Sequence, residues 1–248
     1  MQLFRPTGRH QPLRLLLMAV GVLTVVVVFC MALPPESLAR RGGHQRITFA
    51  VVGDSIANEL GKGMQSLYYR SQHVRVVKKT RFSTGLVRTD YYNWYAVLPP
   101  FLRYYRPDVI AVNIGGNDRQ NLTVNGRRLE RFSRPWLRAY EDRVERFMAL
   151  LKRTGARVYW VGLPQVRSPR MTRDYRTLNQ IYRRQAARHD FTYVSIWDKF
   201  ASAQGRYTPY GRGIDGRERR LRKADGIHFT GAGQLRLAAD VADVMGLR

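Results

Sequence analysis

The sequence contains one cysteine and few acidic residues. Cys30 lies inside a long apolar run, so the rest of the chain has no thiol, which excludes an intramolecular disulfide framework and a thiolate metal site there. Only 18 Asp and Glu residues oppose 43 Lys and Arg residues, and the formal net charge is +25. The chain also shows no internal repeat and no low-complexity segment, so we expect one ordinary folded domain after the apolar run.

The positive charge is spread over nearly every predicted helix and loop. A nucleic-acid-binding protein typically gathers its basic residues on one element with aromatic residues between them, so this spread argues against a nucleic-acid partner. The densest run is RERRLRK at residues 217–223. We interpret it as part of a solvated basic surface. Attraction to anionic lipid headgroups or acidic glycans is the functional alternative.

Residues 15–33 form the apolar run, which contains no charged residue and follows a basic segment, residues 1–14. At about 1.5 Å per residue it approaches the roughly 30 Å hydrocarbon thickness of a bilayer. A cleavable signal peptide has a shorter apolar region of about 7–15 residues, so the length favours an uncleaved transmembrane signal anchor, with cleavage after Ala32 as the alternative. Residues 34–45 read as a tether. We expect the remaining domain, residues 46–248, to lie outside the cytoplasm.

Apolar segments rich in β-branched residues alternate with amphipathic stretches along this domain. Strands are expected at 47–53, 74–78, 108–114, 157–162 and 191–196, and helices at 136–153, 172–188 and 232–245. This alternation predicts an α/β fold, a three-layer α/β/α sandwich around a five-stranded, mostly parallel sheet. Residues 119–135 and 204–222 are expected to be irregular excursions.

Three short motifs carry residues suited to acyl transfer through a serine. Gly53-Asp54-Ser55 closes the first predicted strand, Gly115-Gly116-Asn117-Asp118 closes the third, and Asp225-Gly226-Ile227-His228 lies near the C-terminus. Ligands bind beyond the carboxyl ends of the strands in sheets of this kind, which places the first two motifs at one site. Together the motifs supply a nucleophile, an amide donor, an acid and a base.

Each candidate residue has a role that its position allows. Ser55 should begin a helix, with its hydroxyl exposed and its amide at the positive helix end, although an ordinary Asp-Ser helix cap is the alternative. Asp225 lies three residues before His228 and could orient the imidazole as a general base. The Asn117 amide could stabilise an oxyanion, or the motif could be a plain turn. Gly85 follows the second strand and could donate its N–H, or be an ordinary loop glycine.

Taken together, these stretches resemble the conserved blocks of the SGNH (GDSL-type) hydrolase superfamily, over about residues 46–246. In details such as Leu86-Val87-Arg88 and Asp225-Gly226-Ile227-His228, the sequence resembles a bacterial periplasmic branch of this superfamily, whose function is unassigned. The resemblance implies a flavodoxin-like α/β/α fold and serine ester chemistry without a metal or other cofactor. It implies Ser55, His228 and Asp225 as catalytic residues, and an oxyanion hole of the Ser55 and Gly85 amides with the Asn117 side chain.

Three functions remain open at this point. The first is an envelope-anchored ester enzyme that hydrolyses esters of a glycan or lipid through an acyl-serine intermediate. The second is an O-acyltransferase that moves acyl groups onto a cell-envelope glycan, with a membrane partner delivering them. The third is a non-catalytic binding protein for acidic polymers or anionic lipid, whose function would survive Ser55→Ala. On the bacterial reading, the protein lies in the inner membrane with its domain facing the periplasm, or is secreted there if the segment is cleaved.

Four side chains near the motifs are candidate substrate contacts: Arg88, Tyr91, Trp94 and Arg119. The two aromatic residues follow Gly85 and could form a platform for a sugar ring, although packing on a helix face explains them equally well. The arginines flank the predicted pocket mouth, with surface solvation as the alternative.

Overall fold

A computed structural model of the chain describes residues 46–247. The basic N-terminal segment, the proposed anchor at 15–33 and the tether at 34–45 lie outside these residues. None of the helices within residues 46–247 has both the length and the apolar character needed to cross a bilayer.

The centre of the fold is a parallel sheet of five strands in the order β2-β1-β3-β6-β7. The strands are β1 (Ile47–Gly53), β2 (Val74–Thr80), β3 (Val109–Asn113), β6 (Arg157–Val161) and β7 (Thr192–Val194). All five residues of β3 are buried, because helices cover both faces of the sheet at its centre. The five predicted strands and their parallel arrangement are confirmed.

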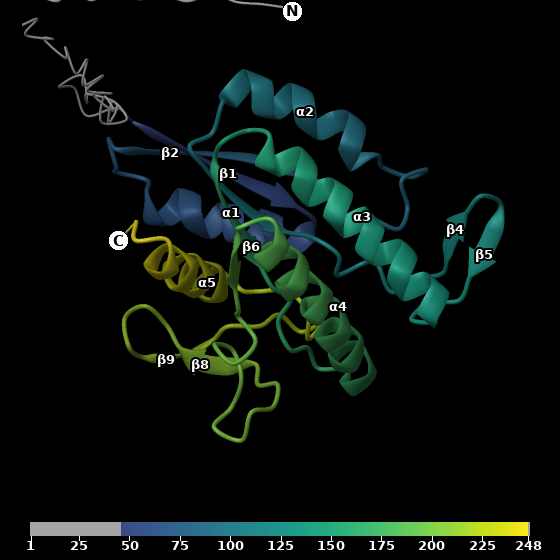
Figure 1. The fold of residues 1–248 in the computed structure, drawn as a ribbon. Helices are drawn as coiled ribbons and strands as arrows, with labels where there is room; N and C mark the ends of the chain where they lie inside the picture. The colour runs from purple at the N-terminus through teal and green to yellow at the C-terminus, as the bar shows by residue number, and fades with distance from the viewer. Residues whose placement is uncertain (1–45, 248) are drawn as a thin grey trace, which may run out of the picture. The chain divides into compact units, whose positions relative to one another are not determined.

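Five helices form the two outer layers (Figure 1). The helices α1 (Ser55–Leu67) and α5 (Gly231–Val244) cover one face, and α2 (Trp94–Tyr105), α3 (Arg134–Lys152) and α4 (Pro169–Arg188) cover the other. Each helix begins after a residue whose side-chain oxygen accepts a backbone N–H of the first turn, namely Asp54, Asn93, Ser133, Ser168 and Thr230. The predicted three-layer sandwich is therefore confirmed.

The helix α2 was not among the predicted helices. Pro99 and Pro100 lie inside it and interrupt the sequence pattern of a regular helix. The helix forms because Trp94, Leu98 and Leu102 pack into the core beneath it.

The two excursions are more regular than expected. Residues 119–135 contain a hairpin of β4 (Leu122–Val124) and β5 (Arg127–Leu129), and residues 204–222 contain another of β8 (Tyr210–Arg212) and β9 (Glu218–Arg220). In the first hairpin, Asn125 and Gly126 both have positive φ, at 49° and 76°, which two-residue hairpin turns with an Asn-Gly sequence favour. That dipeptide was a hairpin signal that the expectation of an irregular segment missed.

Close packing of α1 against α5 gives a test of the fold. A Cβ at Gly63 of α1 would collide with the backbone carbonyl of Gln234 in α5. We expect Gly63→Ala to lower the free energy of unfolding by about 1–3 kcal/mol, measured by urea denaturation, because overpacking forces the two helices apart. The matched control is Gly231→Ala, since a Cβ at Gly231 meets open space. Equal stability of the two variants would contradict this packing.

Candidate active site

Three side chains from opposite ends of the domain form a hydrogen-bonded line. The imidazole Nε2 of His228 lies 2.8 Å from the Ser55 hydroxyl, and its Nδ1 lies 2.7 Å from Oδ2 of Asp225. The order of contacts is serine, histidine, carboxylate, which is the arrangement that activates a serine nucleophile. Ser55 and His228 are 173 positions apart in the chain, and the fold brings them together, as the motifs predicted.

The Asp225 carboxylate also fixes the turn that carries the histidine. Its Oδ1 accepts hydrogen bonds from the backbone N–H groups of Ile227 and His228, at 2.8 and 2.9 Å. Partial burial opposes ionisation of Asp225, but these two amides and the His228 ring outweigh it and lower its pKa to about 2. The group is therefore ionised at neutral pH and can orient and stabilise a positively charged imidazole.

Ser55 begins α1, directly after β1. Asp54 caps this helix, accepting a hydrogen bond from the Ile56 N–H at 3.1 Å. The other oxygen of Asp54 accepts from the N–H groups of Gly115 and Gly116, each at 3.2 Å. Burial raises the pKa of Asp54 to about 7 against these hydrogen bonds. As the sequence suggested, Asp54 is a capping residue, and it also joins the loops after β1 and β3.

Backbone donors without an acceptor lie on the loops beside Ser55. Within residues 46–247, neither the Ser55 N–H nor the Gly85 N–H donates a hydrogen bond, although Gly85 is buried. The Asn117 side-chain amide donates to the carbonyl of Thr84 at 2.9 Å, which uses one of its two N–H groups. Buried amides are nearly always paired, so these free donors mark a place for an outside acceptor.

The three donors come from three neighbouring strands. Ser55 follows β1, Gly85 lies in the loop after β2, and Asn117 lies in the loop after β3, and these strands are adjacent in the sheet. Because the strands are parallel, their carboxyl ends lie at the same end of the sheet. Ligands bind at this end in sheets of this kind.

Asp118 holds the Gly85 loop in place. Its buried carboxylate accepts hydrogen bonds from the backbone N–H groups of Leu86 and Val87, both at 2.8 Å, and from the Tyr140 hydroxyl at 2.8 Å. Burial raises the pKa of Asp118. A Cβ at Gly85 would collide with this carboxylate, so only glycine allows the loop to lie so close. Asp118 thus braces the loop after β2 from its place in the turn after β3.

A buried glutamate on α1 binds the loop that carries His228, here called the histidine loop. The sequence motifs did not point to this residue. Glu59 accepts from the backbone N–H of Phe229 at 2.9 Å and pairs with Lys223 at 2.7 Å. Its position, one helical turn after Ser55, is the only sequence signal that could have pointed to it. The contact ties the loop that carries His228 to the helix that carries Ser55.

The interpretation of residues 217–223 as solvated basic surface is wrong for Arg222. Arg222 is completely buried and donates to the carbonyls of Gln165, at 2.9 Å, and Ile227, at 2.6 Å. Its guanidinium lies over the Phe229 ring, 4.4 Å from the centroid, and burial lowers its pKa to about 10. Arg222 therefore supports the histidine loop from beneath, and Lys223 pairs with Glu59.

The candidate substrate contacts divide into exposed and buried residues. Tyr91 is exposed and Arg88 is half-exposed, in a two-point ion pair with Asp90. Arg119 pairs with Asp174 at 2.8 Å. The expectation for Trp94 is wrong: the ring is fully buried, and its indole N–H donates to the Thr84 hydroxyl, so it packs beneath the Gly85 loop.

The carboxylates near Ser55 have partners within the protein. Asp54 and Asp118 are held by backbone amides, and Asp225 by the His228 loop. In the part of the chain from 46 to 247, no group of three or more His, Cys, Asp or Glu side chains is placed to hold a metal ion.

Solved structures share this fold. LAE5, an α/β hydrolase from the metagenome of Lake Arreo, aligns with a TM-score of 0.59 at 18% identity, over 83% of this chain and 99% of that one. A catalytic mutant of Axe2, an acetylxylan esterase from Geobacillus stearothermophilus, aligns with a TM-score of 0.58 at 16% identity, over 82% and 96%. The lipase/acylhydrolase from Enterococcus faecalis gives 0.56 at 16%, over 81% and 95%. The likeness shows the fold, which is that of the SGNH hydrolases.

A comparison with curated proteins found no sequence that matches this chain. Residues 48–244 match a family model described as "Protein of unknown function (DUF459)". The match covers nearly the whole described domain, and the chain therefore belongs to this family.

Proposed function

We propose that the protein is a serine ester enzyme that acts through an acyl-Ser55 intermediate. The observation that carries this proposal is the line of Ser55, His228 and Asp225, with distances of 2.8 and 2.7 Å, beside amides of Ser55 and Gly85 that have no acceptor in residues 46–247. A serine with a positioned base and a set of free donors is what acyl transfer requires.

In the acylation half, the Ser55 oxygen attacks the ester carbonyl carbon while Nε2 of His228 takes the hydroxyl proton. The carbonyl oxygen becomes an oxyanion, which the amides of Ser55 and Gly85 and the free N–H of Asn117 stabilise. The tetrahedral species then breaks its bond to the alcohol oxygen, and His228 returns its proton to that oxygen. Asp225 remains ionised throughout and stabilises the protonated imidazole.

In the second half, His228 takes a proton from the incoming hydroxyl as that oxygen attacks the acyl-Ser55 carbonyl. The bond to Ser55 breaks, and the proton passes from His228 back to the serine. Water as the attacking group makes the protein a hydrolase, whereas a sugar hydroxyl makes it an O-acyltransferase. The residues described above serve either outcome, so product analysis in the presence of an oligosaccharide distinguishes them.

The substrate class that we propose is an ester-bearing glycan or lipid of the cell envelope. Esterases acting on acetylated xylan and a lipase/acylhydrolase are among the structurally similar proteins, which supports both classes of alcohol. The apolar run at 15–33 supports an anchor in a bacterial inner membrane with the domain in the periplasm. A membrane partner that supplies acyl groups belongs to the transferase alternative.

Replacing the nucleophile tests the proposal directly. We expect Ser55→Ala to lower the release of 4-nitrophenol from a short acyl ester by about 10⁴-fold or more, since the variant lacks the hydroxyl that His228 contacts. Ser66→Ala, at an exposed position of the same helix, should keep wild-type turnover. Added oligosaccharide should give an acylated sugar, detected by mass spectrometry, only if the protein is a transferase. Equal turnover by the Ser55→Ala variant and wild type would refute serine chemistry.

Asp225→Asn should affect both catalysis and the pH dependence of stability. We expect kcat to fall by about 10⁴-fold at neutral pH, because the amide cannot hold the imidazole in the required tautomer. The pKa of Asp225 is lowered to about 2 in the fold, so its ionised form stabilises the protein above about pH 4, and this stabilisation is lost as the pH falls towards 2.

Urea unfolding between pH 2 and 7 measures the second effect. The difference in stability between wild type and Asp225→Asn should be largest above about pH 4 and should vanish near pH 2. Asp142→Asn, at an exposed position of α3, should show no such trend. A difference that persists unchanged at pH 2 would mean that ionised Asp225 does not stabilise the turn.

Glu59 should act as a positioning residue for His228. We expect Glu59→Ala to lower kcat by about tenfold with little change in KM, since losing a buried hydrogen bond costs about 1–3 kcal/mol and loosens the histidine loop. Glu59→Gln keeps an acceptor for the Phe229 N–H and should recover most of the rate. Glu145→Ala, on the exposed side of α3, is the control. An equal loss in the alanine and glutamine variants would show that the Phe229 contact does not position the loop.

A further inference from the structure

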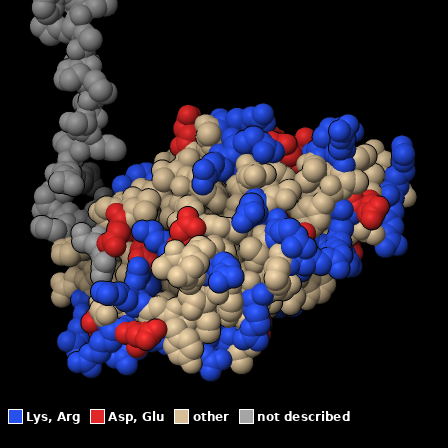
Figure 2. Space-filling view, turned by 90° about the horizontal axis from the view of Figure 1, so that it is seen from below, with Lys and Arg blue, Asp and Glu red and all other residues tan. Residues whose placement is uncertain are grey.

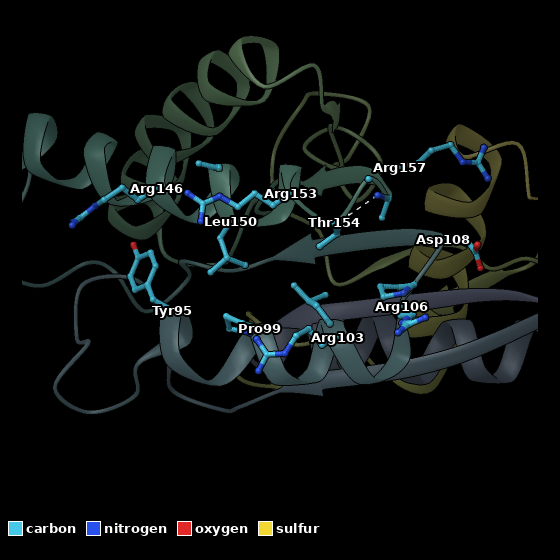
Figure 3. A pocket seen from close by; sticks show the side chains of 15 residues that line it. Tyr95, Pro99, Arg103, Arg106, Asp108, Arg146, Leu150, Arg153, Thr154 and Arg157 are labelled. Atoms are coloured by element: carbon cyan, nitrogen blue, oxygen red, sulfur yellow. Dashed lines mark hydrogen bonds between the residues drawn. The ribbon is translucent and has the colours of Figure 1, made fainter. Parts of the chain in front are cut away.

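A cavity of about 1210 Å³ lies between α2 and α3 and is also lined by the segments that follow these two helices (Figure 3). Its walls carry five arginines: Arg103, Arg106, Arg146, Arg153 and Arg157. Apolar residues also line it, Pro99, Leu102 and Leu150 among them. We call this feature the arginine cleft.

The arginines of the cleft are not neutralised by the protein. Across residues 46–247, none of the five forms an ion pair with a carboxylate. Arg146 donates to the backbone carbonyl of Asp142 and lies over the Tyr95 ring. The one acidic residue of the lining, Asp108, accepts from the Thr48 N–H at 2.7 Å. By contrast, Arg88 and Arg119, which follow the Gly85 and Asn117 loops, are each paired with a carboxylate.

The cleft lies at the amino ends of the strands, and Ser55 lies at their carboxyl ends. Asp108 and Arg157 stand at the amino ends of β3 and β6, whereas Ser55 follows the carboxyl end of β1. The chain enters the described domain at residue 46, at the amino end of β1, which pairs in parallel with β3. The apolar run of residues 15–33 ends shortly before that point in the sequence. The cleft therefore lies at the same end of the sheet as residue 46, the residue that follows the apolar run and the expected tether in the sequence.

We propose that the arginine cleft binds the headgroups of anionic phospholipids at a bilayer surface. Guanidinium groups bind phosphate oxygens in a two-point geometry, and apolar residues in the same lining suit the boundary between headgroups and acyl chains. Tyr104, on the same turn as Arg103, is 79% exposed, as aromatic residues at membrane interfaces are. Basic residues near an anionic membrane surface are attracted to it.

One consequence concerns the substrate, and it rests on the proposed enzymatic function. With the cleft against the bilayer, the edge that carries Ser55 faces away from it. The ester that reaches Ser55 then belongs to a glycan beyond the membrane surface and not to a lipid within the bilayer.

Spin labelling of the full chain tests this orientation. Cys30 is the only cysteine, so Cys30→Ser with Tyr104→Cys gives a single labelling site next to Arg103 of the cleft. Cys30→Ser with Tyr91→Cys gives one in the segment after β2, at the carboxyl ends of the strands. Each labelled protein is reconstituted in nanodiscs of phosphatidylcholine alone or mixed with phosphatidylglycerol. Power saturation with a neutral nickel chelate measures how far each label is exposed to water.

We expect the label at 104 to lose nickel accessibility when phosphatidylglycerol is present and to regain it at high salt, where charges are screened. The label at 91 should be unchanged. Arg103→Gln with Arg153→Gln should abolish the loss at 104, whereas Arg127→Gln with Arg217→Gln, which removes the same charge from the two hairpins, should not.

Three results would overturn the proposal. The first is equal accessibility at 104 in both kinds of disc. The second is a loss at 104 caused by free glycerol phosphate in phosphatidylcholine discs, which would indicate a site for a soluble phosphate. The third is a loss caused by soluble polygalacturonate but not by phosphatidylglycerol, which would make the cleft a site for an acidic polymer. All three readings are independent of ester turnover, so they distinguish this proposal from the enzymatic one.

Discussion

The Asp54 carboxylate joins the loops on which the rest of the site depends. It accepts one amide from the start of α1 and two from the turn after β3, so a single buried group fixes where the Ser55 helix begins relative to Asn117. In the same way, the Asp118 carboxylate, in the turn after β3, binds two amides of the loop after β2. Two carboxylates therefore set the positions of three strand ends, and the free amides of Ser55 and Gly85 result from this rigid arrangement.

His228 comes from the opposite end of the chain to Ser55. Glu59 and Arg222 bind the backbone of its loop, at Phe229 and Ile227, from the serine helix and from below. The positive surface in Figure 2 has Lys and Arg distributed over the face shown, with few acidic residues between them. Most of these charges are solvated, and only particular arginines, such as Arg222, have a structural task.

Much of this site could be predicted because its signals are local. Most of the central strands are nearly continuous apolar runs, although β2 carries Arg75, Lys78 and Lys79. Asp225 and His228 are three residues apart, within reach of one turn. The remaining features depend on contacts between distant residues. Glu59 and Lys223 are 164 positions apart, and nothing near either residue indicates the pair. The burial of Trp94 and Arg222 likewise depends on the residues that pack around them, such as Gln165 beside Arg222. The hairpin at Asn125-Gly126 is different, because its turn signal was present in the sequence.

Covalent labelling of the serine is the most direct measurement of the central claim. A fluorophosphonate reacts with an activated serine by forming an oxygen–phosphorus bond and releasing fluoride, and its adduct resembles the tetrahedral species of ester transfer. We expect one adduct on the intact protein, located on Ser55 by peptide mass spectrometry and absent from the Asp225→Asn variant under the same brief exposure. No adduct on the wild type, or equal labelling of Ser55 and the exposed Ser66, would contradict an activated nucleophile at this position.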